Sequence, residues 1–110
     1  MPISEPREWF ERELPALVQA DPTKVKGFNG TLLFTIKGDR GGSWTVDIRD
    51  LQLDVKAGPR SNPDITITIK DGDFVDFINK KLSGEIAFTT GKLKVKGDIQ
   101  LAMKLQGLLI

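Results

Sequence analysis

Apolar and polar residues alternate in five short segments of the chain. Every second side chain is apolar in residues 31–37, 44–49, 51–56, 65–70 and 92–96. A period of two residues predicts β-strands, and it is typical of a sheet with one face covered and the other in water. A glycine-rich segment at 38–42 predicts a hairpin turn between the first two strands.

Apolar residues at helical spacing predict a helical segment before the strands. Ser4 is a suitable cap for a helix that runs from Glu5 to Glu13. Pro15 interrupts the apolar stripe, because proline removes a backbone donor and its ring clashes with the preceding turn. We therefore expect a second short helix at 15–20 rather than one kinked helix.

Two further helices are expected between the fourth and fifth strands. Asp71 and Ser83 are the candidate caps. The apolar side chains of these helices are Phe74, Phe77, Ile78, Leu82, Ile86, Ala87 and Phe88.

The last segment, 99 to about 109, is predicted to be a helix capped by Asp98. At 100° per residue its apolar side chains cover roughly 220° of the helix, whereas a helix on a sheet needs about 100° or somewhat more. These side chains are Ile99, Leu101, Ala102, Met103, Leu105, Leu108 and Leu109. The pattern alone leaves three interpretations open: the wall of a ligand cavity, an ordinary buried helix, or half of a dimer contact.

Composition narrows the chemistry. The chain has 110 residues, a net charge of +1 and no Cys, His or Tyr. The length suits one domain, and the balanced charge gives no reason to expect nucleic acid as a partner. Without Cys and His, thiolate nucleophiles, the usual general base and the commonest transition-metal ligands are missing. We therefore expect no enzyme, no cofactor and no metal site.

Two clusters of charge have both a structural and a functional interpretation, and we favour the structural one for each. Three carboxylates suit a hard cation but also complement the start of a helix; they are Asp71, Asp73 and Asp76. Three lysines could meet anionic lipid headgroups or guard an edge strand against pairing; they are Lys92, Lys94 and Lys96. The second pair of interpretations is compatible.

The letters of several segments resemble a known family, the sterol carrier protein 2 domain, also called the nonspecific lipid-transfer domain. The resemblance is strongest in 91–97 (GKLKVKG) and in 98–106 (DIQLAMKLQ). It is supported by 43–48 (SWTVDI) and by 64–69 (DITITI), which leads into 73–77 (DFVDF). It extends from about Gly27 to Leu109.

The resemblance implies an α+β fold in a single domain, residues 1–110. Its five-stranded, mainly antiparallel sheet would have the order 3-2-1-4-5, with helices over one face and an apolar tunnel between them. The family binds fatty acids, fatty acyl-CoA, phospholipids and sterols, and it offers no catalytic residues to carry over. Lipid binding or transfer is therefore the expected function. The alternative is a non-catalytic dimerisation or interaction module that uses the same apolar groove.

The resemblance also implies which side chains touch the lipid. The expected wall residues are Phe34, Trp44, Val46, Ile67, Phe77, Ile78, Leu82, Ile86, Phe88, Leu101, Met103, Leu105 and Leu108. A flexible thioether such as that of Met103 adapts to ligands of different shape.

The sequence also gives expectations about the location and the assembly of the protein. The N-terminal residues MPISEPREW lack the cationic start and apolar run of a signal peptide. The chain stops at Ile110 without a peroxisomal Ser-Lys-Leu-type signal. We expect a cytoplasmic, stand-alone bacterial or archaeal protein. It would be a monomer or homodimer, with transient contact to anionic membranes.

Overall fold

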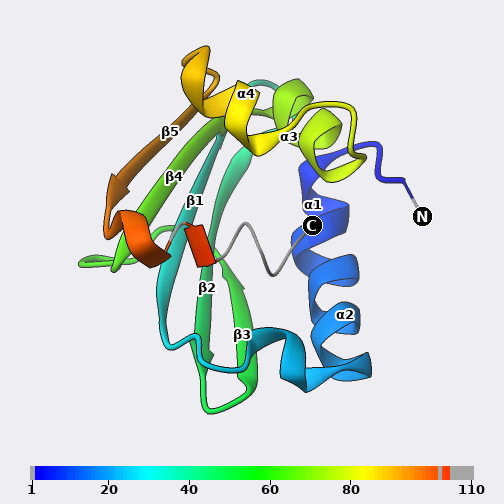
Figure 1. The fold of residues 1–110 in the computed structure, drawn as a ribbon. Helices are drawn as coiled ribbons and strands as arrows, with labels where there is room; N and C mark the ends of the chain where they lie inside the picture. Colours follow the sequence, from blue (N-terminus) through cyan, green and yellow to red (C-terminus); the bar gives the residue numbers. More distant parts are fainter. Residues whose placement is uncertain (1, 102, 105–110) are drawn as a thin grey trace.

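Five strands form one mixed sheet with the order β3-β2-β1-β4-β5 (Figure 1). The computed structural model describes residues 2–101, 103 and 104. The strands are β1 (Gly30–Lys37), β2 (Gly42–Arg49), β3 (Gln52–Ala57), β4 (Ile65–Lys70) and β5 (Leu93–Gly97). β1 and β4 are parallel and the other neighbours are antiparallel. The predicted α+β class and strand order are confirmed.

The register places the inward side chains in rows across the sheet. One row runs Ala57, Trp44, Phe34, Ile67 and Val95, from the β3 edge to the β5 edge. The three central members of this row are buried, whereas Ala57 is exposed and Val95 is half-buried. The central strands therefore build the core, and the two edge strands depend on what covers them.

The N-terminal helical segment is continuous, so the prediction of two separate helices was wrong. It consists of α1 (Pro6–Glu8), a π-helical turn (Trp9–Glu13) and α2 (Leu14–Ala20). The Leu14 N–H bonds the carbonyl of Trp9, five residues back. The wider turn lies directly before Pro15, which lacks an N–H and would crowd an ordinary turn. Figure 1 shows this segment beside the sheet; α4 lies over the upper end of the strands, and α3 lies between α4 and the upper end of α1.

Two short helices, α3 (Asp71–Ile78) and α4 (Gly84–Thr89), connect β4 to β5. Ser83 caps α4 as predicted, because its Oγ accepts a hydrogen bond from the N–H of Ile86 at 3.1 Å. Asp71 does not cap α3; it is the first helical residue. Its Oδ2 instead accepts the N–H of Arg40 at 3.1 Å, which ties the β1–β2 turn to α3.

The end of the described chain is also capped. Asp98 Oδ1 accepts the N–H of Gln100 at 3.0 Å, and residues 99–101, 103 and 104 are helical. The start of the predicted last helix is confirmed, and its continuation to about residue 109 lies outside the described residues. No helix in the described part of the chain has the length and apolar character needed to cross a membrane.

Several strand boundaries shift by one or two residues from the alternation pattern, and the shift at the start of the third strand moves a residue into a turn. Leu51 was expected to begin the third strand, but β3 begins at Gln52. Asp50 and Leu51 form a two-residue hairpin turn with φ of 51° and 69°. Positive φ at both central residues matches the twist of the flanking strands. The alternation continues into this turn, which explains why the pattern misplaced Leu51.

An aromatic cluster fixes the N-terminal segment to the sheet. Phe10 is fully buried, and its ring centroid lies 4.9 Å from Phe34, 4.7 Å from Trp44 and 5.2 Å from Phe74. Trp9 packs edge-on against Phe10 at 4.9 Å. Such pairs contribute about 0.5–1.5 kcal/mol each beyond the area they bury. This cluster joins the N-terminal helical segment, β1, β2 and α3. Three of its rings, those of Trp9, Phe34 and Phe74, also line the cavity described next.

Candidate functional site

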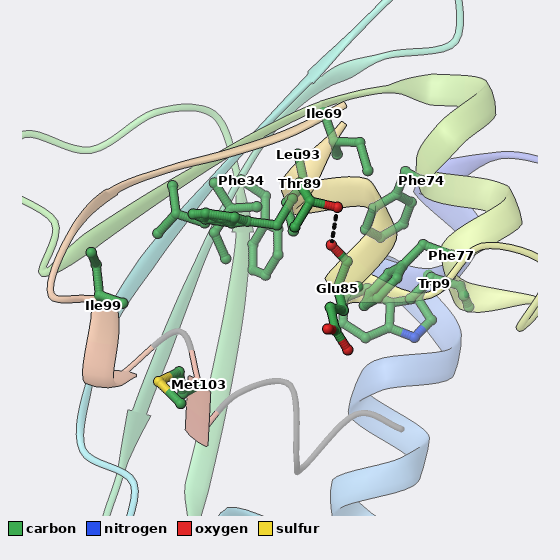
Figure 2. Close-up of a pocket in the computed structure, with 15 residues that line it drawn as sticks. Trp9, Phe34, Ile69, Phe74, Phe77, Glu85, Thr89, Leu93, Ile99 and Met103 are labelled. Atoms are coloured by element: carbon green, nitrogen blue, oxygen red, sulfur yellow. Dashed lines mark hydrogen bonds between the residues drawn. The ribbon is translucent and has the colours of Figure 1, made fainter. Parts of the chain in front are cut away.

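A cavity of about 360 Å³ lies between the β4–β5 half of the sheet and helices α3 and α4 (Figure 2). Its wall consists of Trp9, Phe34, Ile67, Ile69, Phe74, Phe77, Ile78, Gly84, Glu85, Phe88, Thr89, Leu93, Val95, Ile99 and Met103. This volume is within the range of small-molecule sites, about 300–1,000 Å³. Nearly all of the wall is apolar, as expected for a site that holds a hydrocarbon.

The cavity has a buried end and an exposed end. Trp9 and Phe34, at 5% and 4% exposure, belong to the buried end. Phe88, Ile99 and Met103 are 49%, 58% and 68% exposed, and they also line the cavity. Large apolar side chains on a wall that faces water mark a binding site more often than an ordinary surface. The exposed end is therefore the natural point of entry for a ligand.

Among the described residues, polar groups on the wall are few, and none is basic. Glu85 and Thr89 lie one turn apart on α4, and the Thr89 hydroxyl donates a hydrogen bond to the Glu85 carbonyl at 3.0 Å. In the described part of the chain, no group of three His, Cys, Asp or Glu side chains could hold a metal ion. The wall is suited to enclosing an apolar molecule, and these two polar side chains are exposed on α4.

The family is decided by comparison with known proteins. The model of the SCP-2 sterol transfer family matches residues 12–110. The chain belongs to the SCP-2 sterol transfer family. The predicted resemblance is thereby confirmed, and the family is one of lipid-transfer modules.

Curated relatives of the family include larger proteins. The chain is 41% identical over 87 residues to "Peroxisomal multifunctional enzyme A" of Dictyostelium discoideum, covering 77% of this chain and 20% of that protein. It is 38% identical over 87 residues to human "Sterol carrier protein 2", covering 76% of this chain and 16% of that protein. The chain thus spans about a fifth or less of the length of these relatives.

Solved structures of the family have the same fold. The SCP2-L2 crystal structure from Aedes aegypti matches with a TM-score of 0.75 and 30% identity, covering 91% of this chain and 93% of that one. The NMR structure of palmitated SCP2L2 from the same organism matches with a TM-score of 0.76 and 31% identity, covering 93% and 92%.

The structure brings six of the residues expected from the SCP-2 family onto one wall. They are Phe34, Ile67, Phe77, Ile78, Phe88 and Met103. They come from β1, β4, α3, α4 and the segment after β5, so they converge only through the fold. Their contact with lipid stays a prediction.

Five other expected residues of this SCP-2 domain do not line the cavity within the described part of the chain. Trp44 stacks on Phe10 toward the β3 edge, at a centroid distance of 4.7 Å. Val46 is 1% exposed in the core, whereas Ile86 is 55% exposed. The remaining two, Leu82 and Leu101, are half-buried. Leu105 and Leu108 lie outside the described residues.

Leu101 illustrates why an inward residue can still miss the cavity. Its Cδ1 lies 3.5 Å from the point where a Cβ on Gly30 would stand. It therefore packs at the start of β1, a position that the family pattern did not distinguish from the cavity wall.

Several wall residues were missed. They are Trp9, Ile69, Phe74, Gly84, Glu85, Thr89, Leu93, Val95 and Ile99. A signal was available for Leu93 and Val95, because the alternation already places both on the inward face. The register pairs them with Ile69 and Ile67 of the neighbouring strand. Glu85 and Thr89 carried no signal, since exposed polar residues are normal on a short helix.

Proposed function

We propose that this chain binds and transfers lipids, holding an apolar chain in the cavity between β4, β5, α3 and α4. Its ligands would be fatty acids, fatty acyl-CoA, phospholipids or sterols. The observation that carries the proposal is the apolar wall, which continues from the buried Phe34 to the exposed Met103. Membership of the SCP-2 sterol transfer family supports it.

The energetics of such a site need little polar help. Each methylene removed from water contributes about 0.8 kcal/mol, so a long acyl chain can bind well without a specific headgroup contact. Loose selectivity follows from the same fact, because hydrophobic burial is not directional. Met103 at the exposed end adds an adaptable side chain.

The direct test is competitive binding. A fluorescent fatty acid should bind saturably at micromolar or tighter affinity, and a long-chain acyl-CoA should displace it. Absence of saturable binding by any acyl, phospholipid or sterol ligand would contradict the proposal. A concentration-dependent dimer without lipid binding would instead support the interaction module.

Native mass spectrometry of protein purified from its own host is the complementary measurement. It should detect a lipid adduct of defined mass, and it reports whether the chain is a monomer or a homodimer in the same spectrum. A cytoplasmic location and contact with anionic membranes stay predictions from the sequence.

A further inference from the structure

We propose that Glu85 selects lipids with an uncharged hydroxyl headgroup over lipids with a free carboxylate. This inference rests on the proposed function. It adds which type of lipid headgroup binds best at the cavity. The feature that carries it is the chemistry of the exposed polar side chains on the wall, which among the described residues are those of Glu85 and Thr89.

Both side chains belong to the same face of α4. They are four residues apart, which places them one turn apart on a helix, and both are exposed and line the cavity. Figure 2 shows them between Phe77 and the segment that carries Ile99 and Met103. A lipid whose tail fills the buried end would leave its polar end beside these two groups.

Thr89 can serve a ligand only as an acceptor. Its hydroxyl donates to the Glu85 carbonyl at 3.0 Å and lies 3.3 Å from the Ile86 carbonyl. A hydroxyl has a single proton to donate, so what remains for a ligand is the oxygen lone pairs. The Glu85 carboxylate is also an acceptor. Among the described residues, the polar side chains Glu85 and Thr89 of the wall thus offer acceptors and no donor.

Among the described wall residues, no positive charge offsets the negative charge of Glu85. None of the wall residues is a lysine or arginine. All sixteen basic side chains of the chain fall within the described residues, and Glu85 takes part in none of the ion pairs found there. The Trp9 indole is a donor, but Trp9 is 5% exposed and belongs to the buried end.

The two headgroups should therefore bind differently. A ligand hydroxyl can donate to Glu85 or Thr89, whereas a ligand carboxylate beside these two described side chains meets a second negative charge and no donor from either. Two like charges about 6 Å apart in a largely aqueous setting repel by an amount equivalent to about threefold in affinity, and by more where water is excluded.

The experiment compares palmitate with cetyl alcohol, which share a chain length and differ at the polar end. Each displaces the same fluorescent probe from the purified chain, below the concentration at which either ligand aggregates. We expect cetyl alcohol to bind about threefold or more tightly than palmitate. Glu85→Gln should raise the palmitate affinity and leave the alcohol affinity nearly unchanged, and Glu85→Lys should reverse the preference.

Glu11→Gln is the matched control, because it removes the same charge from an exposed glutamate outside the cavity wall. It should leave the ratio of the two affinities as it is in the unmodified chain. Palmitate binding as tightly as cetyl alcohol, or an unchanged ratio in both Glu85 variants, would overturn the role of Glu85 while leaving lipid binding intact. If neither ligand displaces the probe, and no acyl-CoA, phospholipid or sterol does so, the proposed function fails and this inference fails with it.

Discussion

The two edge strands of the sheet, β3 and β5, each turn two apolar side chains inward, but different helices cover them. At one edge β3 turns Leu53 and Val55 inward, and at the other edge β5 turns Leu93 and Val95 inward. All four side chains are half-buried. Leu93 and Val95 line the apolar cavity, whereas Leu53 and Val55 border a different hollow.

The difference lies in what covers each edge. The β3 edge faces the N-terminal helical segment, which contributes Phe10, Glu11 and Pro15 to a hollow of about 500 Å³. Trp44 Nε1 donates to Glu11 Oε2 there at 3.3 Å, and Asp54 adds a further carboxylate. This second hollow therefore has a partly polar wall. The β5 edge faces α3 and α4, which supply mainly apolar groups to the cavity.

The comparison shows that the strand pattern alone does not make a lipid site. Identical residue types on β3 and β5 line two different hollows, according to the helices that lie over them. The following predictions test this asymmetry between the two edges.

The largest expected effect comes from the aromatic cluster that covers the β3 side. Phe10→Ala removes a fully buried ring, so it should lower the free energy of unfolding by about 3–5 kcal/mol. Phe88→Ala, at a side chain 49% exposed on the cavity wall, should cost about 1 kcal/mol or less but weaken lipid binding. Urea denaturation and probe titration measure the two effects. Equal losses of stability in the two variants would contradict the distinction between core and wall.

The second prediction uses the matched valines. Val95→Glu places a carboxylate on the apolar wall and should weaken binding of a fluorescent fatty acid by about tenfold or more, because the charge must be desolvated when the acyl chain fills the cavity. Val55→Glu makes the same change on the opposite edge strand and should alter the affinity by less than about twofold. Equal losses of affinity would mean that the ligand extends to both edges.

The strands were predictable because each carries its own signal. Leu32, Phe34 and Ile36 alternate with mainly polar neighbours, and burial of one sheet face follows from that alternation alone. The continuity of the N-terminal helical segment was not predictable, because a proline can either end a helix or follow a wider turn within it. Leu51 was misplaced since a two-residue turn can keep the strand pattern without a glycine.

The cavity was predictable in type but only partly in place. The sequence pattern shows that a strand residue points inward. It does not show which helix residue packs against that side chain. Trp44 and Ile67 illustrate this: both are inward and both flank Phe34 in the same row, yet Trp44 faces the N-terminal segment and Ile67 faces the cavity. The covering helices come from distant parts of the chain, so their placement depends on tertiary packing rather than local pattern.

Trp44 gives a third and smaller effect. Trp44→Phe removes the hydrogen bond to Glu11 and part of the buried ring, so it should lower the free energy of unfolding by about 1–2 kcal/mol. The affinity for a fluorescent fatty acid should stay the same, because Trp44 does not line the cavity among the described residues. Denaturation and titration of one preparation test both statements. A loss of affinity of about threefold or more would mean that Trp44 contacts the ligand, and that the ligand occupies the hollow at the β3 edge as well as the cavity.

The smallest expected effect concerns Asp71, which ties α3 to the turn between β1 and β2. The N–H groups of Arg40 and Gly72, together with the Arg40 charge, lower the pKa of Asp71 below its ordinary value. The folded chain therefore binds this proton less readily than the unfolded chain. The stabilisation is complete above the unfolded pKa, about 4, and is lost as the pH falls through the lower folded pKa.

Asp71→Asn should consequently destabilise the chain at neutral pH, and its difference from the unmodified chain should shrink as the pH falls below about 4. Asp73→Asn is the matched control: it removes a carboxylate from the same first turn of α3, but it leaves the contacts with Arg40 in place. Thermal unfolding across the pH range separates the two variants. If both lose the same stability with the same pH dependence, the helix dipole alone accounts for the effect, and the turn between β1 and β2 does not help to hold α3 over the cavity.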